Sequence, residues 1–300
     1  MYADAFDADW LRSVRAEQPS LIGELLRGRA RREILRDSLR LFIVAADHPA
    51  RGALAAGGRQ AAMADRYDLL ARLVVALKCP GVDGVLGTPD IIEDLAVLGV
   101  LDDKVVVGSM NRGGLRGARF EMDDRFTGYD VPTMLRDGID FAKLLIRINL
   151  ADPATARTLE AAAHAVTAAS MARLPIMLEP FVSEWRADGV IHNDLSTEAV
   201  IKSVAIASGL GASSAYSWLK LPVVPNMERV MSATTLPTLL LGGDPASEQV
   251  ELFETWSAAL ALPGVRGIVA GRTLLYPEND DVAAAVDAVA SLVHSTSQVT

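Results

Sequence analysis

Lys220 stands in the middle of an apolar stretch that reads AYSWLKLPVVP over residues 215–225. With the period of two that strands follow, Tyr216, Trp218 and Lys220 share one face. Such a lysine lies either at a strand end, exposed to solvent, or inside a site. Inside a site, burial lowers its pKa and leaves a nucleophilic amine that can form a Schiff base with a ketone. The stretch alone leaves both alternatives open.

Other charged side chains interrupt or end apolar runs in the same way. Taken singly, Asp47 could form a strand-end salt bridge and Arg147 could face solvent. If the runs are strands of one barrel, however, two lysines and two carboxylates converge on one pocket. A charged lysine favours the neutral, nucleophilic form of a second lysine beside it, and carboxylates can move protons. The candidate catalytic residues are Asp47, Lys143, Glu179 and Lys220.

Glycines and an arginine near the ends of the last two apolar runs are typical of a phosphate site. Gly242 and Gly243 end one run, and Gly271 and Arg272 end the next. In a barrel, the loops after the last two strands commonly bind phosphate through backbone N–H groups, and an arginine adds a charge-assisted contact. Turn glycines are the simpler alternative for the first pair. His48, in the loop after the first run, is a further candidate to contact substrate.

The apolar runs alternate with helix-length segments from residue 41 onward. Eight such runs predict the parallel strands of one (β/α)8 TIM barrel, an α/β fold of about 250 residues. The alternative is a doubly wound open sheet, which needs a glycine-rich turn after its first strand, and residues 47–49 (DHP) are not such a turn. The predicted strands lie at residues 41–47, 81–88, 104–111, 140–149, 175–182, around Lys220, 237–244 and 264–272.

The regions outside the strands predict the rest of the organisation. Residues 8–40 are rich in Leu, Arg, Glu and Ala and predict one or two helices, broken near Pro19. We interpret residues 1–40 as an N-terminal helical cap and residues 41–300 as the barrel domain. Further helices are expected at residues 60–77, 89–98, 153–173, 197–210 and 280–294.

Two connections are longer than a short loop, at residues 112–137 and 183–196. Both follow strands, so we expect both on the carboxyl face of the barrel, where active sites form. Surface elaboration or an oligomer contact is the alternative.

Composition limits the partners and the compartment. The 300 residues are 50% hydrophobic with a formal net charge of −9, which argues against a general nucleic-acid partner. The single cysteine excludes an intramolecular disulfide framework, and neither a signal peptide nor an apolar run of about 20 residues is recognised. The four histidines follow no metal-binding pattern, so no metal and no cofactor is expected. We predict a cytoplasmic homo-oligomer, without membrane association, that binds a small phosphorylated substrate.

Taken in order, these segments resemble the class I, or Schiff-base, aldolases over about residues 40–290. The relevant branch holds the tagatose-1,6-bisphosphate and archaeal-type fructose-bisphosphate aldolases, with deoxyribose-phosphate aldolase more distant. The chain is most similar to an actinobacterial subgroup of (β/α)8 proteins often found beside inositol-catabolism genes. The matching segments are AADHP (45–49), VDGVLGT (82–88), DFAKLLIRI (140–148), LPIMLEPF (174–181), WLKLPVV (218–224), PTLLLGGD (237–244) and GIVAGRTLLYP (267–277).

The resemblance implies a Schiff-base role for Lys220, and it matches Lys143, Glu179 and Asp47 to charged residues of the tagatose-bisphosphate branch. It also matches Gly243 and Arg272 to phosphate-binding residues. The implied reaction cleaves a phosphorylated ketose or keto-acid to dihydroxyacetone phosphate and an aldehyde. Another Schiff-base lyase or acyl transferase, or a non-catalytic phosphometabolite-binding barrel, are the alternatives on the same fold.

The chain departs from the family pattern at two places. Phe181 stands where archaeal-type enzymes carry a tyrosine proton donor, which leaves the acid/base work to Glu179. The DHP sequence at residues 47–49 replaces the Asp-Gln-Arg of the tagatose-bisphosphate branch, which argues against a bisphosphate substrate.

Overall fold

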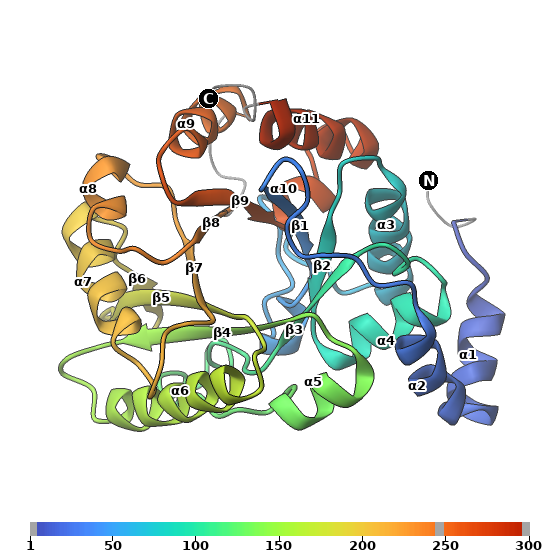
Figure 1. The fold of residues 1–300 in the computed structure, drawn as a ribbon, viewed down its shortest axis with the longest axis horizontal. Coiled ribbons are helices and arrows are strands. Elements are labelled where there is room, and N and C mark those ends of the chain that lie inside the picture. The colour runs from blue at the N-terminus through green and yellow to red at the C-terminus, as the bar shows by residue number, and fades with distance from the viewer. Residues whose placement is uncertain (1–4, 244–248, 296–300) are drawn as a thin grey trace.

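The computed structural model describes residues 5–243 and 249–295, so residue 244 of the predicted seventh strand lies outside the described residues. Parallel strands form a closed barrel with helices around it (Figure 1). The order around the ring is β1-β2-β3-β4-β5-β7-β8-β9, and β9 pairs with β1 to close it. The predicted (β/α)8 barrel is confirmed. Its strands are β1 (Leu41–Ala45), β2 (Gly84–Gly87), β3 (Val105–Ser109), β4 (Phe141–Ile148), β5 (Ile176–Trp185), β7 (Ser217–Leu221), β8 (Thr238–Leu241) and β9 (Val265–Ala270).

Helices cover the outside of the barrel (Figure 1). The predicted helix over residues 60–77 begins only at Arg66, because the Asp65 carboxylate caps it by accepting the N–H groups of Tyr67 and Asp68. Among the described helices, none is long and apolar enough to cross a bilayer. The helices after β1 are η1 (Pro49–Arg51), α3 (Arg66–Lys78), α4 (Pro89–Val97), α5 (Val131–Asp137), α6 (Ala154–Met171), α7 (Thr197–Ser208), α8 (Met227–Met231), α9 (Gln249–Leu260), α10 (Arg272–Leu275) and α11 (Val282–Ser295).

The N-terminal segment differs in part from the prediction. Helices α1 (Ala8–Glu17) and α2 (Pro19–Gly28) confirm two helices with a break near Pro19. The prediction of helix over residues 29–40 is wrong, because this stretch runs across the end of the barrel where the strands begin (Figure 1). Ile34 and Leu35 pack there against the apolar side chains of the barrel interior. Apolar contacts and ion pairs with the barrel therefore replace the helical hydrogen bonds of this segment.

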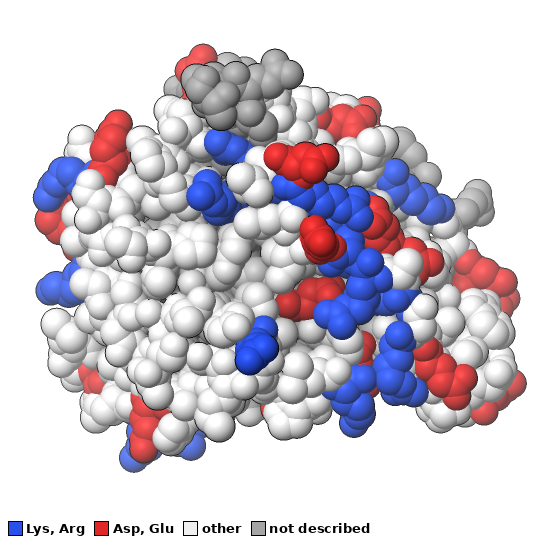
Figure 2. Space-filling model, in the orientation of Figure 1, with Lys and Arg blue, Asp and Glu red and all other residues white. Residues whose placement is uncertain are grey.

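Asp140, just before β4, anchors residues 29–31 to the barrel. The Arg29 guanidinium donates to Asp140 Oδ2 at 2.5 Å, and both side chains are only 3% exposed. The same oxygen accepts the Val106 N–H at 2.9 Å, and Arg31 pairs with Oδ1 at 2.8 Å. Figure 2 shows that basic and acidic side chains are interleaved on the face seen in Figure 1. Ion pairs therefore hold the N-terminal segment across this end.

Asp140→Asn should lower the free energy of unfolding by about 3–5 kcal/mol, because it leaves the buried Arg29 charge unpaired. Urea denaturation measures the change. Arg31→Ala is the control, since Arg31 is 55% exposed and its pair with Asp140 should contribute at most about 1 kcal/mol. Equal effects of the two variants would contradict this account of the anchor.

The barrel interior is apolar toward the amino ends of the strands, here called the lower part, and charged toward their carboxyl ends, the upper part. Along β4 the inward positions are Phe141, Lys143, Leu145 and Arg147, so the two charged residues share one face as the alternation predicts. The ionic side chains begin where the apolar filling ends, toward the carboxyl ends of the strands. The apolar filling consists of Leu41, Ile43, Ala45, Leu86, Val105, Val107, Phe141, Met177, Leu239 and Val269.

Candidate active site

Four charged side chains meet inside the upper barrel. Lys143 Nζ donates to Asp47 Oδ2 at 2.8 Å and forms an ion pair with Glu179 Oε2 at 2.7 Å. Lys220 Nζ donates to the other oxygen of Glu179, Oε1, at 2.8 Å. Each of these side chains is 10% exposed or less. The structure thus brings all four predicted catalytic residues into one row, in the order Asp47, Lys143, Glu179, Lys220.

The strand order explains why these residues can touch. Leu145 of β4 is in register with Glu179 of β5, and Met177 of β5 with Trp218 of β7, so Lys143 and Lys220 stand on the two strands that flank Glu179. Asp47 follows β1 and reaches Lys143 from across the barrel. A buried carboxylate between two buried ammonium groups is the centre of the arrangement.

The two lysines differ in their electrostatic surroundings. Burial alone would lower the pKa of Lys143, but the carboxylates of Asp47 and Glu179 outweigh burial and raise that pKa above its ordinary value. Burial lowers the pKa of Lys220, and the charge of Lys143 lowers it further, while Glu179 opposes both only in part. Lys143 therefore stays charged, whereas Lys220 is the amine that becomes neutral more easily.

Both carboxylates stay ionised. Burial would raise the pKa of Glu179, yet Lys143 and Lys220 lower it to about 2. Burial would likewise raise the pKa of Asp47, which Lys143 and then His48 and Lys220 lower below its usual range. A carboxylate, a fixed ammonium and a titratable amine are the groups that carbonyl chemistry requires.

The row opens into a cavity of about 870 Å³ at the carboxyl ends of the strands. Glu179 and Lys220 line it, together with all the predicted substrate-binding residues. Arg272 is the first residue of α10 and not the last of a strand, which corrects the predicted strand end. A side chain at position 271 would bring its Cβ to 2.2 Å from the Ala45 carbonyl oxygen, so glycine is required there. The predicted residues in the lining are His48, Gly242, Gly243, Gly271 and Arg272.

The first long connection, residues 112–137, is tied down beside the cavity. The Arg116 N–H donates to the Arg51 carbonyl at 2.9 Å, and Asn111 makes two hydrogen bonds to the Leu145 backbone. Glu121 accepts the Gly117 N–H at 2.9 Å through one carboxylate oxygen. This connection lies on the carboxyl face, as predicted.

Arg51, Glu121 and Arg147 were not predicted as parts of a site. Arg147 is buried and pairs with Glu121 at 2.8 Å, so it does not face solvent. Arg51 and Arg116 also line the cavity, and within the described residues neither guanidinium makes an ion pair. Only the alternation of β4 could have indicated Arg147, because the other contacts join distant parts of the chain.

The second long connection, residues 183–196, is partly a hairpin and not only a loop. Strand β5 continues to Trp185, and β6 (Ile191–Asn193) returns antiparallel to it, with Ser183 opposite Asn193. The Ser183 hydroxyl donates to Asn193 Oδ1 at 2.8 Å. His192 is exposed on β6, at the rim of the cavity. The connection lies on the carboxyl face, as expected.

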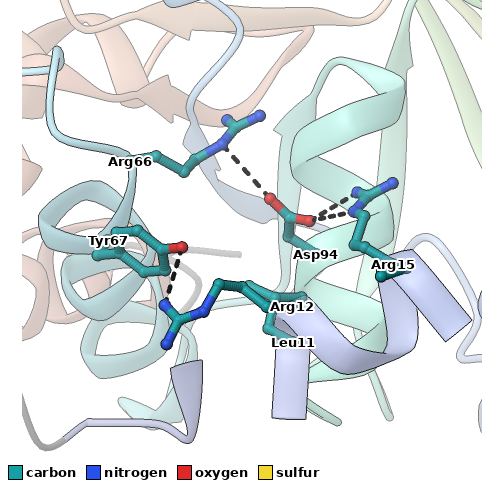
Figure 3. Close-up of a pocket in the computed structure, with 7 residues that line it drawn as sticks. Leu11, Arg12, Arg15, Arg66, Tyr67 and Asp94 are labelled. Carbon is teal, nitrogen blue, oxygen red and sulfur yellow. Dashed lines mark hydrogen bonds and ion pairs between the residues drawn. The ribbon is translucent and has the colours of Figure 1, made fainter. Parts of the chain in front are cut away.

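A second cavity, of about 410 Å³, lies under α1 (Figure 3). Its charged groups satisfy one another: Asp94 binds Arg15 at 2.6 Å and Arg66 at 3.4 Å, and Arg12 donates to the Tyr67 hydroxyl at 3.1 Å. These contacts attach α1 to the barrel and leave no unmatched charge that would favour a ligand. Across residues 5–243 and 249–295, no group of three or more His, Cys, Asp or Glu side chains is placed to hold a metal ion.

The barrel fold is shared with solved aldolase structures. An archaeal fructose 1,6-bisphosphate aldolase is 18% identical and has a TM-score of 0.63, with 91% of this chain and 99% of that one covered. The fructose-bisphosphate aldolase from Slackia heliotrinireducens is 15% identical with a TM-score of 0.66, over 97% and 88% of the two chains. The protein therefore has the TIM-barrel fold of these aldolases.

The chain belongs to the Cgl0159-like family, whose model matches residues 39–290. The crystal structure of Cgl0159 from Corynebacterium glutamicum is 62% identical, with a TM-score of 0.94, and 97% of this chain and 98% of that one are covered. No curated protein matches the chain. The likeness to the aldolases is one of fold, while Schiff-base chemistry and the association with inositol catabolism stay predictions.

The difference between the two lysines can be measured by competitive labelling with trace acetic anhydride across pH. Lys220 should react with a pKa below the ordinary lysine value of 10.5, while Lys143 should resist labelling over the same range. Lys143→Met should raise the pKa of Lys220, because the charge of Lys143 lowers it.

Lys202→Met, on the exposed side of α7, is the control and should leave the titration of Lys220 unchanged. Labelling of Lys143 at a lower pH than Lys220 would reverse the assignment of the two lysines.

Proposed function

We propose that this protein is a class I aldolase that cleaves a phosphorylated ketose or keto-acid through a Schiff base on Lys220. The observation that carries the proposal is the unequal pair of lysines on Glu179. Lys220 lines the cavity and has a lowered pKa, whereas Lys143 is held charged between two carboxylates. A neutral amine next to a fixed positive charge and a carboxylate is the arrangement of an activated lysine nucleophile.

In the proposed reaction, the neutral Lys220 amine attacks the C2 ketone, and loss of water gives an iminium. Glu179, positioned by Lys143, takes the proton of the C4 hydroxyl. The C3–C4 bond then breaks, its electrons move toward the iminium nitrogen, and the aldehyde leaves. Protonation of the resulting enamine at C3 and hydrolysis release dihydroxyacetone phosphate and free Lys220.

The phosphate of the substrate is proposed to lie at the ends of β8 and β9. Gly242 and Gly243 present backbone there, and Arg272 supplies a charge that can bind phosphate through two hydrogen bonds. Lys220 stands on β7, beside β8 in the ring, so a ketone next to the phosphate would reach it.

The other end of the substrate is proposed to be anionic as well. In the ring of strands, β8 lies opposite β3, and β9 lies opposite β4. Arg116 lies in the connection after β3, Arg147 lies on β4, and both line the cavity. Glu121 neutralises Arg147, but Arg51 and Arg116 keep their charges on the cavity. A protein with a net charge of −9 that gathers this much positive charge in one cavity favours an anionic ligand. A phosphorylated keto-acid has the required two ends.

Borohydride trapping tests the nucleophile. Incubation with dihydroxyacetone phosphate and borohydride should add the mass of the reduced adduct to the peptide that carries Lys220. Lys220→Ala should abolish the adduct, because it removes the attacking amine, and Lys202→Met should leave it unchanged. Mass spectrometry of the digested protein locates the adduct. Labelling at Lys143 instead would refute the assigned roles, and no label at all would favour a non-catalytic phosphometabolite-binding barrel.

Glu179→Gln separates adduct formation from bond cleavage. Since Glu179 raises the pKa of Lys220, the variant should still form the adduct, and Lys143 keeps Asp47 as a partner. Cleavage, measured as triose-phosphate release from a panel of phosphorylated ketoses and keto-acids, should fall by about 10² to 10⁴-fold, as for other general acid/base groups. Near-normal turnover in this variant would mean that another group takes the C4 hydroxyl proton.

We propose that the protein acts in sugar or inositol catabolism in the cytoplasm, as a homo-oligomer, and that its chemistry needs no metal or cofactor. The long connection at residues 112–137 and the β5–β6 hairpin are proposed to shape the substrate end of the cavity. The division into a cap (residues 1–40) and a barrel domain (41–300) is kept as a proposal.

A further inference from the structure

His48 lines the same cavity as Lys220 but stands outside the row of short ion pairs. Its Nδ1 is buried and has no hydrogen-bond partner within the described residues, and it lies 3.8 Å from Asp47 Oδ1. The other oxygen of Asp47 binds Lys143, so Oδ1 is the oxygen turned to the imidazole. This separation is too long for a hydrogen bond, so Asp47 acts on the imidazole through its charge and does not fix the tautomer.

Burial and the surrounding charges together keep the His48 imidazole neutral while the cavity holds no anion. Burial, joined by the positive charges of Arg272, Arg51 and Lys220, lowers the pKa of His48 to about 3, although Asp47 opposes the shift. A phosphate bound at Arg272 would offset part of this positive charge and raise the proton affinity of the ring. The imidazole can therefore accept a proton, and bound substrate helps it to hold one.

In the proposed reaction, no side chain is yet assigned to the protonation of the enamine at C3. Glu179 is assigned to the C4 hydroxyl, and Phe181, the next inward residue of β5, has no proton to give. His48 follows β1, which pairs with β9, and it lines the cavity together with Arg272 and Lys220, so it lies near the end where the ketone and the phosphate would bind. C3 is bonded to the ketone carbon, so it too lies at this end.

We propose that His48 is the catalytic residue that moves the C3 proton of the Schiff-base intermediate, an inference that rests on the proposed aldolase function. In cleavage, the imidazolium form, protonated from solvent, gives the Nε2 proton to C3 of the enamine. The enamine π electrons form the new C3–H bond, and the nitrogen lone pair re-forms the C2=N iminium. In the reverse direction, neutral His48 removes a C3 proton from the iminium of dihydroxyacetone phosphate, and the C–H electrons form the enamine.

Hydrogen exchange isolates this step from bond cleavage. In D₂O, the wild-type protein should exchange a C3 hydrogen of dihydroxyacetone phosphate for deuterium, which NMR follows directly. His48→Asn should slow the exchange by about 10²-fold or more, the scale for losing a general acid/base group. Borohydride trapping on Lys220 should persist in the same variant, which shows that the site is intact. His48→Gln provides a second variant of similar polarity should His48→Asn fail to fold.

Two further variants sharpen the comparison. His164→Asn changes an exposed histidine on α6 that does not line the cavity, and it should leave exchange unchanged. Glu179→Gln should keep exchange while losing cleavage, because Glu179 acts at the C4 hydroxyl. Exchange at the wild-type rate in a His48 variant that is still trapped would overturn the proposal. Trapping without exchange in the wild-type protein would overturn it too, whereas absence of wild-type trapping would refute the aldolase function itself.

Discussion

A single buried carboxylate, Glu179, holds two ammonium groups that approach it from neighbouring strands, one on each oxygen. Removing Glu179 would leave Lys220 without its ion-pair partner, and removing Lys143 would do the same to Asp47, in a region with little access to water, which is costly. The four side chains therefore connect β1, β4, β5 and β7 at the level where the apolar filling ends. The groups assigned to chemistry are also the groups that keep the upper barrel in one arrangement.

The asymmetry of the row comes from Asp47. Its carboxylate gives Lys143 a second close partner that Lys220 lacks, and it is the strongest influence that raises the pKa of Lys143. The loop after β1 supplies Asp47 and His48, and its Arg51 accepts the Arg116 N–H from the long connection. One short loop thus joins the ionic row, the imidazole and the arginine-rich side of the cavity.

Much of this arrangement could be predicted, because alternation within an apolar strand specifies which side chains point inward. Lys143, Glu179 and Lys220 were accessible in this way, and so was Arg147. Residues 29–40 were not, since their composition is that of a helix and only their contacts with Asp140 and the barrel interior make them extended. The pairing of Glu121 with Arg147, and of β6 with β5, depends on how connections fold back, which no local pattern specifies.

The barrel can close only after the ribosome has synthesised its last strand, β9. Leu41 of β1 is in register with Gly267 of β9, so β1 has no partner on that side until β9 has been translated. Until then, a nascent chain exposes β1 as an open edge, which is the kind of surface that recruits other chains into aggregates. A ribosome that stops before β9 releases a sheet with two such edges. Premature termination before β9 therefore yields material for chaperones and proteases, and not a smaller closed barrel.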